Sequence, residues 1–261
     1  MTLGAISRRT FLFLTPVTLF FLSGCGTKRP GVEYLAVLDI TASVDPLAES
    51  GMFAAVTALA QQLRRGDSLT IILVTGDVQA EASGRVLHYE AGKPREVYDA
   101  DLKNLADRIH ADLDAEKQAA LAHPATHTDL LGAIDLAAEQ GAALLGTRRC
   151  VLLVLSDFLQ DDQEFNFERV KELGDAPKAG RFAEKLAHAH ERRFPVGTVA
   201  YLGLLRSSDY ASLAKVRRQG LEVFWLRYLT LLGVQPTFAT DGPGLLASFL
   251  NHVEGASPAS K

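Results

Sequence analysis

The stretch Tyr34-Leu35-Ala36-Val37-Leu38-Asp39-Ile40-Thr41-Ala42-Ser43 decides the fold of this chain. Its first five residues are apolar without a break, which is typical of a strand buried on both faces of a parallel sheet. Oxygen-bearing side chains follow at alternate positions, at Asp39, Thr41 and Ser43. Mg²⁺ and Mn²⁺ favour oxygen ligands. The stretch therefore predicts a central strand that ends at half of a divalent-cation site.

Two later segments supply the rest of the predicted site. Val151-Leu152-Leu153-Val154-Leu155 is a second apolar run just before Asp157, and Thr128 precedes a segment rich in alanine and leucine that we expect to be a helix. In open α/β sheets, ligands bind at the carboxyl ends of the strands. The predicted metal ligands are Asp39, Thr41, Ser43, Thr128 and Asp157.

Strand and helix signals alternate along the chain, which predicts a three-layer α/β/α, Rossmann-like fold around an open, mostly parallel sheet. Residues 85–90 alternate polar with apolar and follow the preceding strand closely, so we expect one antiparallel edge strand there. The expected strands are 32–40, 68–75, 85–90, 149–156, 196–204 and 237–240. The expected helices are 47–65 (ended by Gly66), 101–121, 129–145, 167–173, 181–193, 210–232 (with a break at Gly220) and 244–253.

The first 24 residues are predicted to be a signal peptide. Arg8 and Arg9 form a twin-arginine element before the apolar stretch 11–22, which is short for a membrane span. Leu22-Ser23-Gly24-Cys25 resembles a bacterial lipobox, and that resemblance implies lipidation of Cys25 and cleavage before it. A plain secretory signal or an uncleaved anchor is the alternative. Residues 25–31 would then be a lipidated tether, 32–254 a single domain and 255–261 a flexible tail.

Composition excludes some functions. The formal net charge is −4, and removal of the two signal arginines makes it −6, which is unfavourable for binding nucleic acid. Cys150 is the only other cysteine, so a disulfide framework is excluded once Cys25 is lipidated. We expect Cys150 to be a small core residue.

With these elements in place, the chain resembles a von Willebrand factor A (vWA) domain over residues 32–253. The metal-ion-dependent adhesion site (MIDAS) of that family combines an Asp-x-Ser-x-Ser loop with a Thr from a second loop and an Asp from a third. The matching segments here are Asp39-Ile40-Thr41-Ala42-Ser43, Thr126-His127-Thr128-Asp129-Leu130-Leu131-Gly132 and Leu155-Ser156-Asp157. The resemblance implies direct ligation by the hydroxyls and largely water-mediated contacts from the two aspartates. It also implies an open coordination position for a partner's carboxylate.

Two positions depart from the family pattern. Thr41 replaces a serine but keeps the hydroxyl, and its β-branch restricts the rotamer. Phe158 stands where many relatives have glycine, and we expect it near the metal face, where it would narrow the approach or contact the partner. Thr126 competes with Thr128 as the ligand from the second loop. We prefer Thr128 because Asp129 then begins a helix directly, and we interpret Asp129 as an early-helix carboxylate rather than a second acceptor behind the metal.

Three other features have plain structural interpretations. Asp161, Asp162 and Glu164 predict a solvated loop rather than a second cation site. His127 is expected to be a surface loop histidine. The aromatic stretch 223–229 is expected to be the core face of a helix rather than a membrane or partner surface.

The predicted function is that of a lipid-anchored vWA module on the extracytoplasmic face of a bacterial envelope, which binds a protein partner through a cation. Mg²⁺ and Mn²⁺ are the preferred cations, and Ca²⁺ is a further candidate. Gly26 is not an aspartate, so in a bacterium with two membranes the lipobox resemblance favours the outer membrane. One alternative is a metal-free structural scaffold of an envelope assembly. A metal-dependent hydrolase is disfavoured, because the dehalogenase-type phosphatase signature needs an aspartate at position 41, so we expect no enzyme activity.

Overall fold

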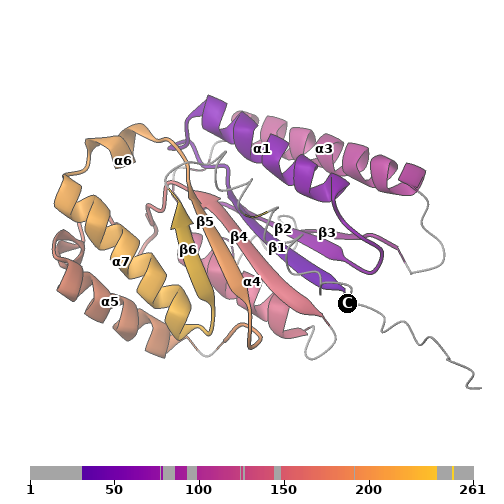
Figure 1. Cartoon of the computed structure of the whole chain (residues 1–261). Coiled ribbons are helices and arrows are strands. Elements are labelled where there is room, and N and C mark those ends of the chain that lie inside the picture. The colour runs from indigo at the N-terminus through magenta and orange to yellow at the C-terminus, as the bar shows by residue number, and fades with distance from the viewer. Residues whose placement is uncertain are drawn as a thin grey trace, which may run out of the picture.

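A six-stranded sheet in the order β3-β2-β1-β4-β5-β6 forms the middle layer of the molecule (Figure 1). This computed structural model describes residues 31–76, 78, 86–92, 99–123, 125, 127–143, 148–190, 192–239 and 249. The strands are β1 (Val32–Asp39), β2 (Ser68–Val74), β3 (Val86–Glu90), β4 (Arg149–Ser156), β5 (Val199–Leu204) and β6 (Gln235–Ala239). Only the β2–β3 pair is antiparallel. The predicted α/β fold with one antiparallel edge strand is confirmed.

Helices cover both faces of the sheet (Figure 1). One layer holds α1 (Pro46–Gln61) and α3 (Asp99–Ala122), and the other holds α4 (Leu130–Ala143), α5 (Ala176–Ala189) and α7 (Lys215–Leu231). Leu35 and Val37 of β1 join the core under α4 and α7, whereas Tyr34, Ala36 and Leu38 join the core under α1 and α3. Both faces of β1 are therefore buried, which explains its continuous apolar sequence.

The limits of α1 and α5 differ from the sequence prediction by four residues or more, whereas α3 and the start of α4 lie within two residues of it. α1 begins after Asp45, whose side chain accepts a hydrogen bond of 2.8 Å from the Leu47 amide, and it ends at Gln61, four residues before the predicted end. Gly66 lies beyond it in a turn, at φ +87°. α5 starts five residues earlier than predicted, because Asp175 accepts from the Lys178 amide at 2.9 Å and so caps the helix.

The predicted helix 210–232 is two helices, α6 (Ser208–Ser212) and α7. The break lies at residues 213–214, and Gly220 is inside α7. A Cβ on Gly220 would lie 2.0 Å from the carbonyl oxygen of Leu173. Leu173 belongs to η1 (Lys171–Gly174), the single 3₁₀ turn that replaces the predicted helix 167–173. Glycine at this position therefore lets α7 pack directly against a backbone carbonyl.

Several predictions concern segments outside the described residues. These are the signal region 1–24 with its two arginines, the tether with Cys25, the competing ligand Thr126 and the tail 255–261. The predicted last helix lies outside them too, except for Phe249, which packs against Tyr34 and Tyr201 with ring centroids 6.1 and 5.0 Å apart. In the described part of the chain, no helix has the length and apolar character needed to cross a membrane.

Candidate functional site

The predicted site lies where the strand order of the sheet changes direction. Asp39 is the last residue of β1, and Asp157 directly follows β4, which pairs with β1 in parallel. From β1 the chain builds β2 and β3 on one side of this strand and β4 to β6 on the other. In open α/β sheets such a point leaves room for a ligand at the carboxyl ends of the strands. The two aspartates therefore approach the same place from neighbouring strands.

The loop after β1 brings three of the predicted ligands into one hydrogen-bonded group. Asp39 Oδ1 accepts from the Thr41 amide at 3.1 Å and from the Thr41 hydroxyl at 2.6 Å. Thr41 Oγ1 lies 3.1 Å from Ser43 Oγ and accepts from Thr128 Oγ1 at 3.2 Å. Four of the five predicted ligands are thus linked through the Thr41 hydroxyl. Thr128 reaches this group from the start of α4, on a different loop.

Asp39 is completely buried, and a serine missed in the sequence analysis helps to hold it. Ser156 Oγ donates to Asp39 Oδ2 at 2.6 Å. Burial raises the pKa of Asp39, and the hydrogen bonds from Ser156 and Thr41 only partly oppose that rise. The position of Ser156, directly before Asp157 at the end of β4, is the sequence signal that could have identified it.

Asp157 is buried with half of its carboxylate unsatisfied. Its Oδ1 accepts from the Leu159 amide at 3.0 Å, whereas Oδ2 makes no hydrogen bond of normal geometry among the described residues, although the hydroxyls of Ser43 and Ser207 lie near the carboxylate. Burial, and after it the charge of Asp39, raises the pKa of Asp157 to about 7, while the Leu159 amide and the hydroxyls of Ser207 and Ser43 act in the opposite direction. A buried polar atom without a partner is uncommon and calls for an explanation such as a bound ion.

Ser207 was also missed by the sequence analysis. It forms an antiparallel bridge with Val44, and the Asp45 amide donates to the Arg206 carbonyl at 2.9 Å. These contacts join the loop after β1 to the loop after β5, beside the candidate site. Ser207 also accepts from the Tyr210 amide at 3.0 Å and so caps α6, which is the role that its place before a short helix could have indicated.

The loop before α4, which contains Thr128, is held by backbone hydrogen bonds. The amides of Thr128 and Asp161 each donate to the other residue's carbonyl, at 2.8 and 2.9 Å. Asp129 accepts from the Gly132 amide at 2.8 Å and from the Val78 amide at 3.2 Å, which confirms that it is a carboxylate at the start of a helix. In the acidic run, Asp161 and Asp162 are partly buried and Glu164 is exposed, so the loop is solvated in part. His127 is exposed, as predicted for a surface histidine.

The prediction for Phe158 is wrong. Its side chain is 1% exposed and packs inward, with ring centroids 5.9 Å from Trp225 and 5.0 Å from Phe238. It neither narrows the approach to the site nor offers a surface to a partner. Its backbone has φ +63°, the left-handed region that favours glycine. The turn, rather than the metal face, explains why glycine suits this position.

The aromatic stretch around Trp225 and the buried cysteine behave as predicted. Phe224, Trp225, Tyr228 and Leu229 of α7 are buried in the core. Cys150 is buried as well, and burial raises the pKa of its thiol to about 12, so the thiolate is strongly disfavoured.

The donor set consists of oxygen atoms: two carboxylates and three hydroxyls. Among the described residues, no three or more His, Cys, Asp and Glu side chains form a group that could hold a metal ion. A site of this composition therefore depends on its hydroxyl groups and on water or a partner to complete the coordination. Hard cations such as Mg²⁺ and Mn²⁺ suit such donors, and the orphaned Asp157 Oδ2 gives a cation a buried anionic ligand.

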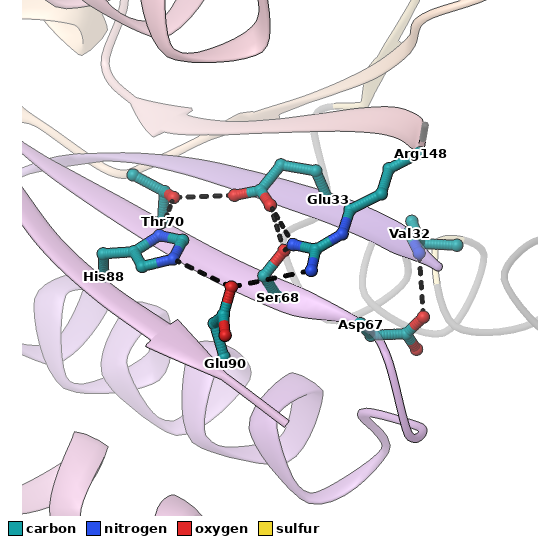
Figure 2. Close-up of polar contacts among 8 residues, drawn as sticks. All are labelled: Val32, Glu33, Asp67, Ser68, Thr70, His88, Glu90 and Arg148. Carbon is teal, nitrogen blue, oxygen red and sulfur yellow. Dashed lines mark hydrogen bonds and ion pairs between the residues drawn. The ribbon is translucent and has the colours of Figure 1, made fainter. Parts of the chain in front are cut away.

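A second polar cluster lies at the other end of β1 (Figure 2). Buried Glu33 accepts from Thr70 Oγ1 at 2.7 Å and from the Ser68 hydroxyl, and its Oε2 lies 3.4 Å from Arg148 Nη1. Arg148 also lies 3.6 Å from Glu90 of the edge strand. Because these groups satisfy one another, we interpret the cluster as a structural link between β1, β2, β3 and the start of β4.

No family model and no curated protein sequence matches this chain. Among solved structures, it is similar to an aerotolerance-related membrane protein from Bacteroides fragilis NCTC 9343, with 12% identity, 86% of this chain and 100% of that chain covered, and a TM-score of 0.46. It is also similar to the conserved hypothetical protein BatB from Bacteroides thetaiotaomicron, with 13% identity, coverages of 86% and 98%, and a TM-score of 0.42. A third similar structure is the pilus adhesin SpaC from Lactobacillus rhamnosus GG, with 11% identity, 88% of this chain but 30% of that chain covered, and a TM-score of 0.48. At these TM-scores the similarities carry no functional inference.

Proposed function

We propose that this chain is a lipid-anchored, extracytoplasmic vWA-like module that binds a protein partner through a divalent cation. The observation that carries the proposal is the pair of buried carboxylates at the carboxyl ends of β1 and β4. Asp157 Oδ2 makes no hydrogen bond of normal geometry among the described residues, and burial together with Asp39 raises the pKa of Asp157 to about 7. A divalent cation bound at this site would favour the charged forms of both carboxylates and would give Asp157 Oδ2 a partner. The ligands in this proposal are Asp39, Thr41, Ser43, Thr128 and Asp157.

A partner completes the site in this proposal. The three hydroxyl ligands are neutral, so two carboxylates at most balance the charge of the cation, and an incoming carboxylate becomes an attractive further ligand. Ser43 is half-buried, whereas the other four ligands are buried, which favours approach from the side of the loop after β1. The bridge between Val44 and Ser207 places the loop after β5 on the same rim.

Attachment to the envelope is the second part of the proposal. It rests on Leu22-Ser23-Gly24-Cys25 and on the twin-arginine element, which lie outside the described residues. Glycine after the cysteine favours the outer membrane where there are two membranes. Mass spectrometry of the protein from bacterial membranes tests this part. A diacylglyceryl group on Cys25 is the expected result, and an intact Met1 to Gly24 segment would contradict it.

Catalysis is disfavoured by the chemistry of position 41. A threonine hydroxyl is far too weak an acid to replace the second aspartate that serves as general acid in a phosphatase of the dehalogenase type, and that of Thr41 donates to Asp39. We therefore propose a binding function without turnover. Hydrolysis of a generic phosphoester that depends on Asp39 would contradict this part.

Thermal unfolding of the purified protein tests the metal site. The protein would be measured in EDTA and then with millimolar Mg²⁺, Mn²⁺ or Ca²⁺. A ligand at about 100 times its dissociation constant stabilises the native state by about 2.7 kcal/mol, which corresponds to a rise in Tm of about 5–11 °C at this chain length. Asp39→Ala should abolish the rise. Asp114→Ala, which removes an exposed carboxylate on α3, is the matched control and should keep it.

The outcomes separate the metal-dependent module from its main alternative. A rise in Tm that is absent only in Asp39→Ala supports the proposal and justifies a search for the partner with metal present. No rise with any of the three cations would overturn the metal-dependent mode of binding, and would instead favour the metal-free scaffold.

A further inference from the structure

We propose that Trp225 of α7 is a positioning residue for the candidate metal site. Its buried indole holds the turn after β4 in the conformation that directs Asp39 and Asp157 into the site. The inference rests on the proposed function of that site, and it adds a residue from a helix that contributes no ligand.

The turn after β4 has an unfavourable backbone conformation. Phe158 is the only non-glycine residue with positive φ among the described residues, at +63°. In this region the Cβ of an L-residue crowds the backbone carbonyl, and a bulky side chain adopts it only when the surrounding structure imposes it. Since Phe158 directly follows Asp157, whatever holds Phe158 also fixes the direction of the Asp157 side chain.

Trp225 makes the contacts that stabilise this backbone conformation of Phe158. Its Nε1 donates to the Phe158 carbonyl oxygen at 3.0 Å, and both side chains are buried. The two rings also pack together, with centroids 5.9 Å apart. A buried carbonyl left without a donor is costly, so the indole N–H stabilises this backbone conformation over alternatives that would turn the carbonyl elsewhere.

The same turn continues to Asp39. The Phe158 amide donates to Ser156 Oγ at 2.9 Å, and Ser156 Oγ donates its single proton to Asp39 Oδ2 at 2.6 Å. Three successive hydrogen bonds therefore link the Trp225 indole through Phe158 and Ser156 to the proposed ligand Asp39. The other carboxylate ligand, Asp157, lies within the three-residue turn that the bond from the Phe158 amide to Ser156 Oγ closes. Loss of the first bond should thus disturb both carboxylates.

The composition of the protein makes this link directly measurable. Trp225 is the only tryptophan in the chain, so an indole labelled with the NMR-active nitrogen isotope gives a single N–H signal. Titration of the purified protein with MgCl₂ should shift this signal along the same curve as the calorimetric binding isotherm. Mg²⁺ is the right probe because it is diamagnetic, whereas Mn²⁺ would broaden the signal by proximity alone. Asp39→Asn should show no Mg²⁺-dependent shift.

Two substitutions on α7 form a matched pair. Trp225→Phe removes the N–H and should raise the Kd for Mg²⁺ about tenfold, as expected when a buried hydrogen bond that orients ligands is lost. Tyr228→Phe removes a buried hydroxyl that has no hydrogen-bond partner among the described residues, and it should leave Kd within about twofold. Both Kd values would be measured well below the Tm of each variant, so that a merely structural loss does not enter them.

Each result supports or overturns the inference. Mg²⁺ binding with a stationary indole signal, or with the same Kd in Trp225→Phe as in the wild type, overturns the positioning role and leaves the metal-binding function standing. Absence of calorimetric Mg²⁺ binding to the wild type overturns both. If Trp225→Phe does not fold, the wild-type indole titration still decides the question.

Discussion

Replacement of Asp157 by asparagine should increase the stability of the metal-free protein and abolish its stabilisation by Mg²⁺. Asp157 and Asp39 are both buried, which disfavours the charged form of each, and the charge of Asp39 disfavours that of Asp157 further. The Asp157→Asn substitution would keep the size of the side chain and the acceptor for the Leu159 amide but remove the charge. A substitution that stabilises the protein while it abolishes ligand binding is the signature of a functional site held under strain.

The magnitude follows from the pKa of Asp157. A rise from 3.8 to about 7 corresponds to about 4 kcal/mol of unfavourable free energy in the folded state once the carboxyl is charged. The Asp157→Asn substitution removes this unfavourable free energy, but it also weakens the hydrogen bond from the Leu159 amide, which loses a charged acceptor. That loss costs about 1–2 kcal/mol. We therefore expect a net gain of about 2 kcal/mol above neutral pH, or a rise in Tm of about 4–8 °C.

The stability of the wild type should also depend on pH, because the pKa of Asp157 differs between the folded and unfolded states. Between about pH 4 and about pH 7 the folded protein keeps a proton on Asp157 that the unfolded chain has lost, so the wild-type stability falls as the pH rises through this window. Below the unfolded pKa both states are protonated, and the stabilisation is fully present. In Asp157→Asn the contribution of Asp157 to this fall is lost, whereas that of Asp39, whose pKa burial also raises, remains, so the fall should be shallower than in the wild type.

Urea denaturation in EDTA from about pH 5 to about pH 8 measures both effects. Asp114→Asn, which removes an exposed carboxylate, should behave like the wild type at every pH. Mg²⁺ should stabilise the wild type and this control but not Asp157→Asn. Lower stability of Asp157→Asn than of the wild type at high pH without metal, or an equally steep fall with pH, would refute the reasoning.

Five further substitutions test three separate parts of the structure. Gly220→Ala places a Cβ 2.0 Å from the Leu173 carbonyl oxygen and should cost about 1–3 kcal/mol in urea, whereas Gly180→Ala meets its nearest neighbouring atom at 3.9 Å and should be neutral or stabilise by up to about 1 kcal/mol. Glu33→Gln should cost about 1–3 kcal/mol, because it leaves a guanidinium without its buried carboxylate, and it should not change the Mg²⁺ response. Thr41→Ser should keep the Kd for Mg²⁺ within about threefold. Thr41→Val removes one ligand, and a loss of about 1.4 kcal/mol of binding free energy would raise the Kd about tenfold. Equal stability of the Gly220→Ala and Gly180→Ala variants would contradict the packing argument, and equal Kd values of the two Thr41 variants would contradict the role of the hydroxyl as a ligand. Loss of the Mg²⁺ response in Glu33→Gln would contradict the separation of the two polar clusters.

The central strands and the gathering of the candidate ligands at one edge of the sheet could be predicted because they depend on strong local patterns. Unbroken apolar runs such as 34–38 and 151–155 have few alternatives to a strand buried on both faces. Polar residues directly after such strands must gather at one edge of a parallel sheet, and Asp39 and Asp157 do so. Neither step required knowledge of the helices.

The helix limits were harder to predict because they depend on caps and on close packing. Asp175 was a possible cap for α5, but Pro177 and Gly180 follow it, and because both residue types disfavour a helix interior, the prediction began too late. Gly220 suggested a break in the helix because glycine disfavours helical structure. Only the approach of Leu173 within the folded core shows that a glycine is required there.

Phe158 shows why the site was only partly predictable. The sequence indicated that a bulky residue stands where glycine is usual, but not whether its side chain faces the ligand or the core. That choice depends on the sign of φ and on a space beside Trp225 and Phe238, residues distant in sequence. The roles of Ser156 and Ser207 depend on similar long-range contacts.

The left-handed residue after Asp157 has a consequence for how relatives of this chain can vary. Glycine at position 158 would adopt the same turn without crowding, and it would leave a void beside the indole of Trp225. A tryptophan at position 225 is therefore useful mainly when position 158 is bulky, and a phenylalanine at 158 is tolerable mainly when an indole lies beneath it. The two positions should change together among homologous sequences, even though 67 residues separate them in the chain.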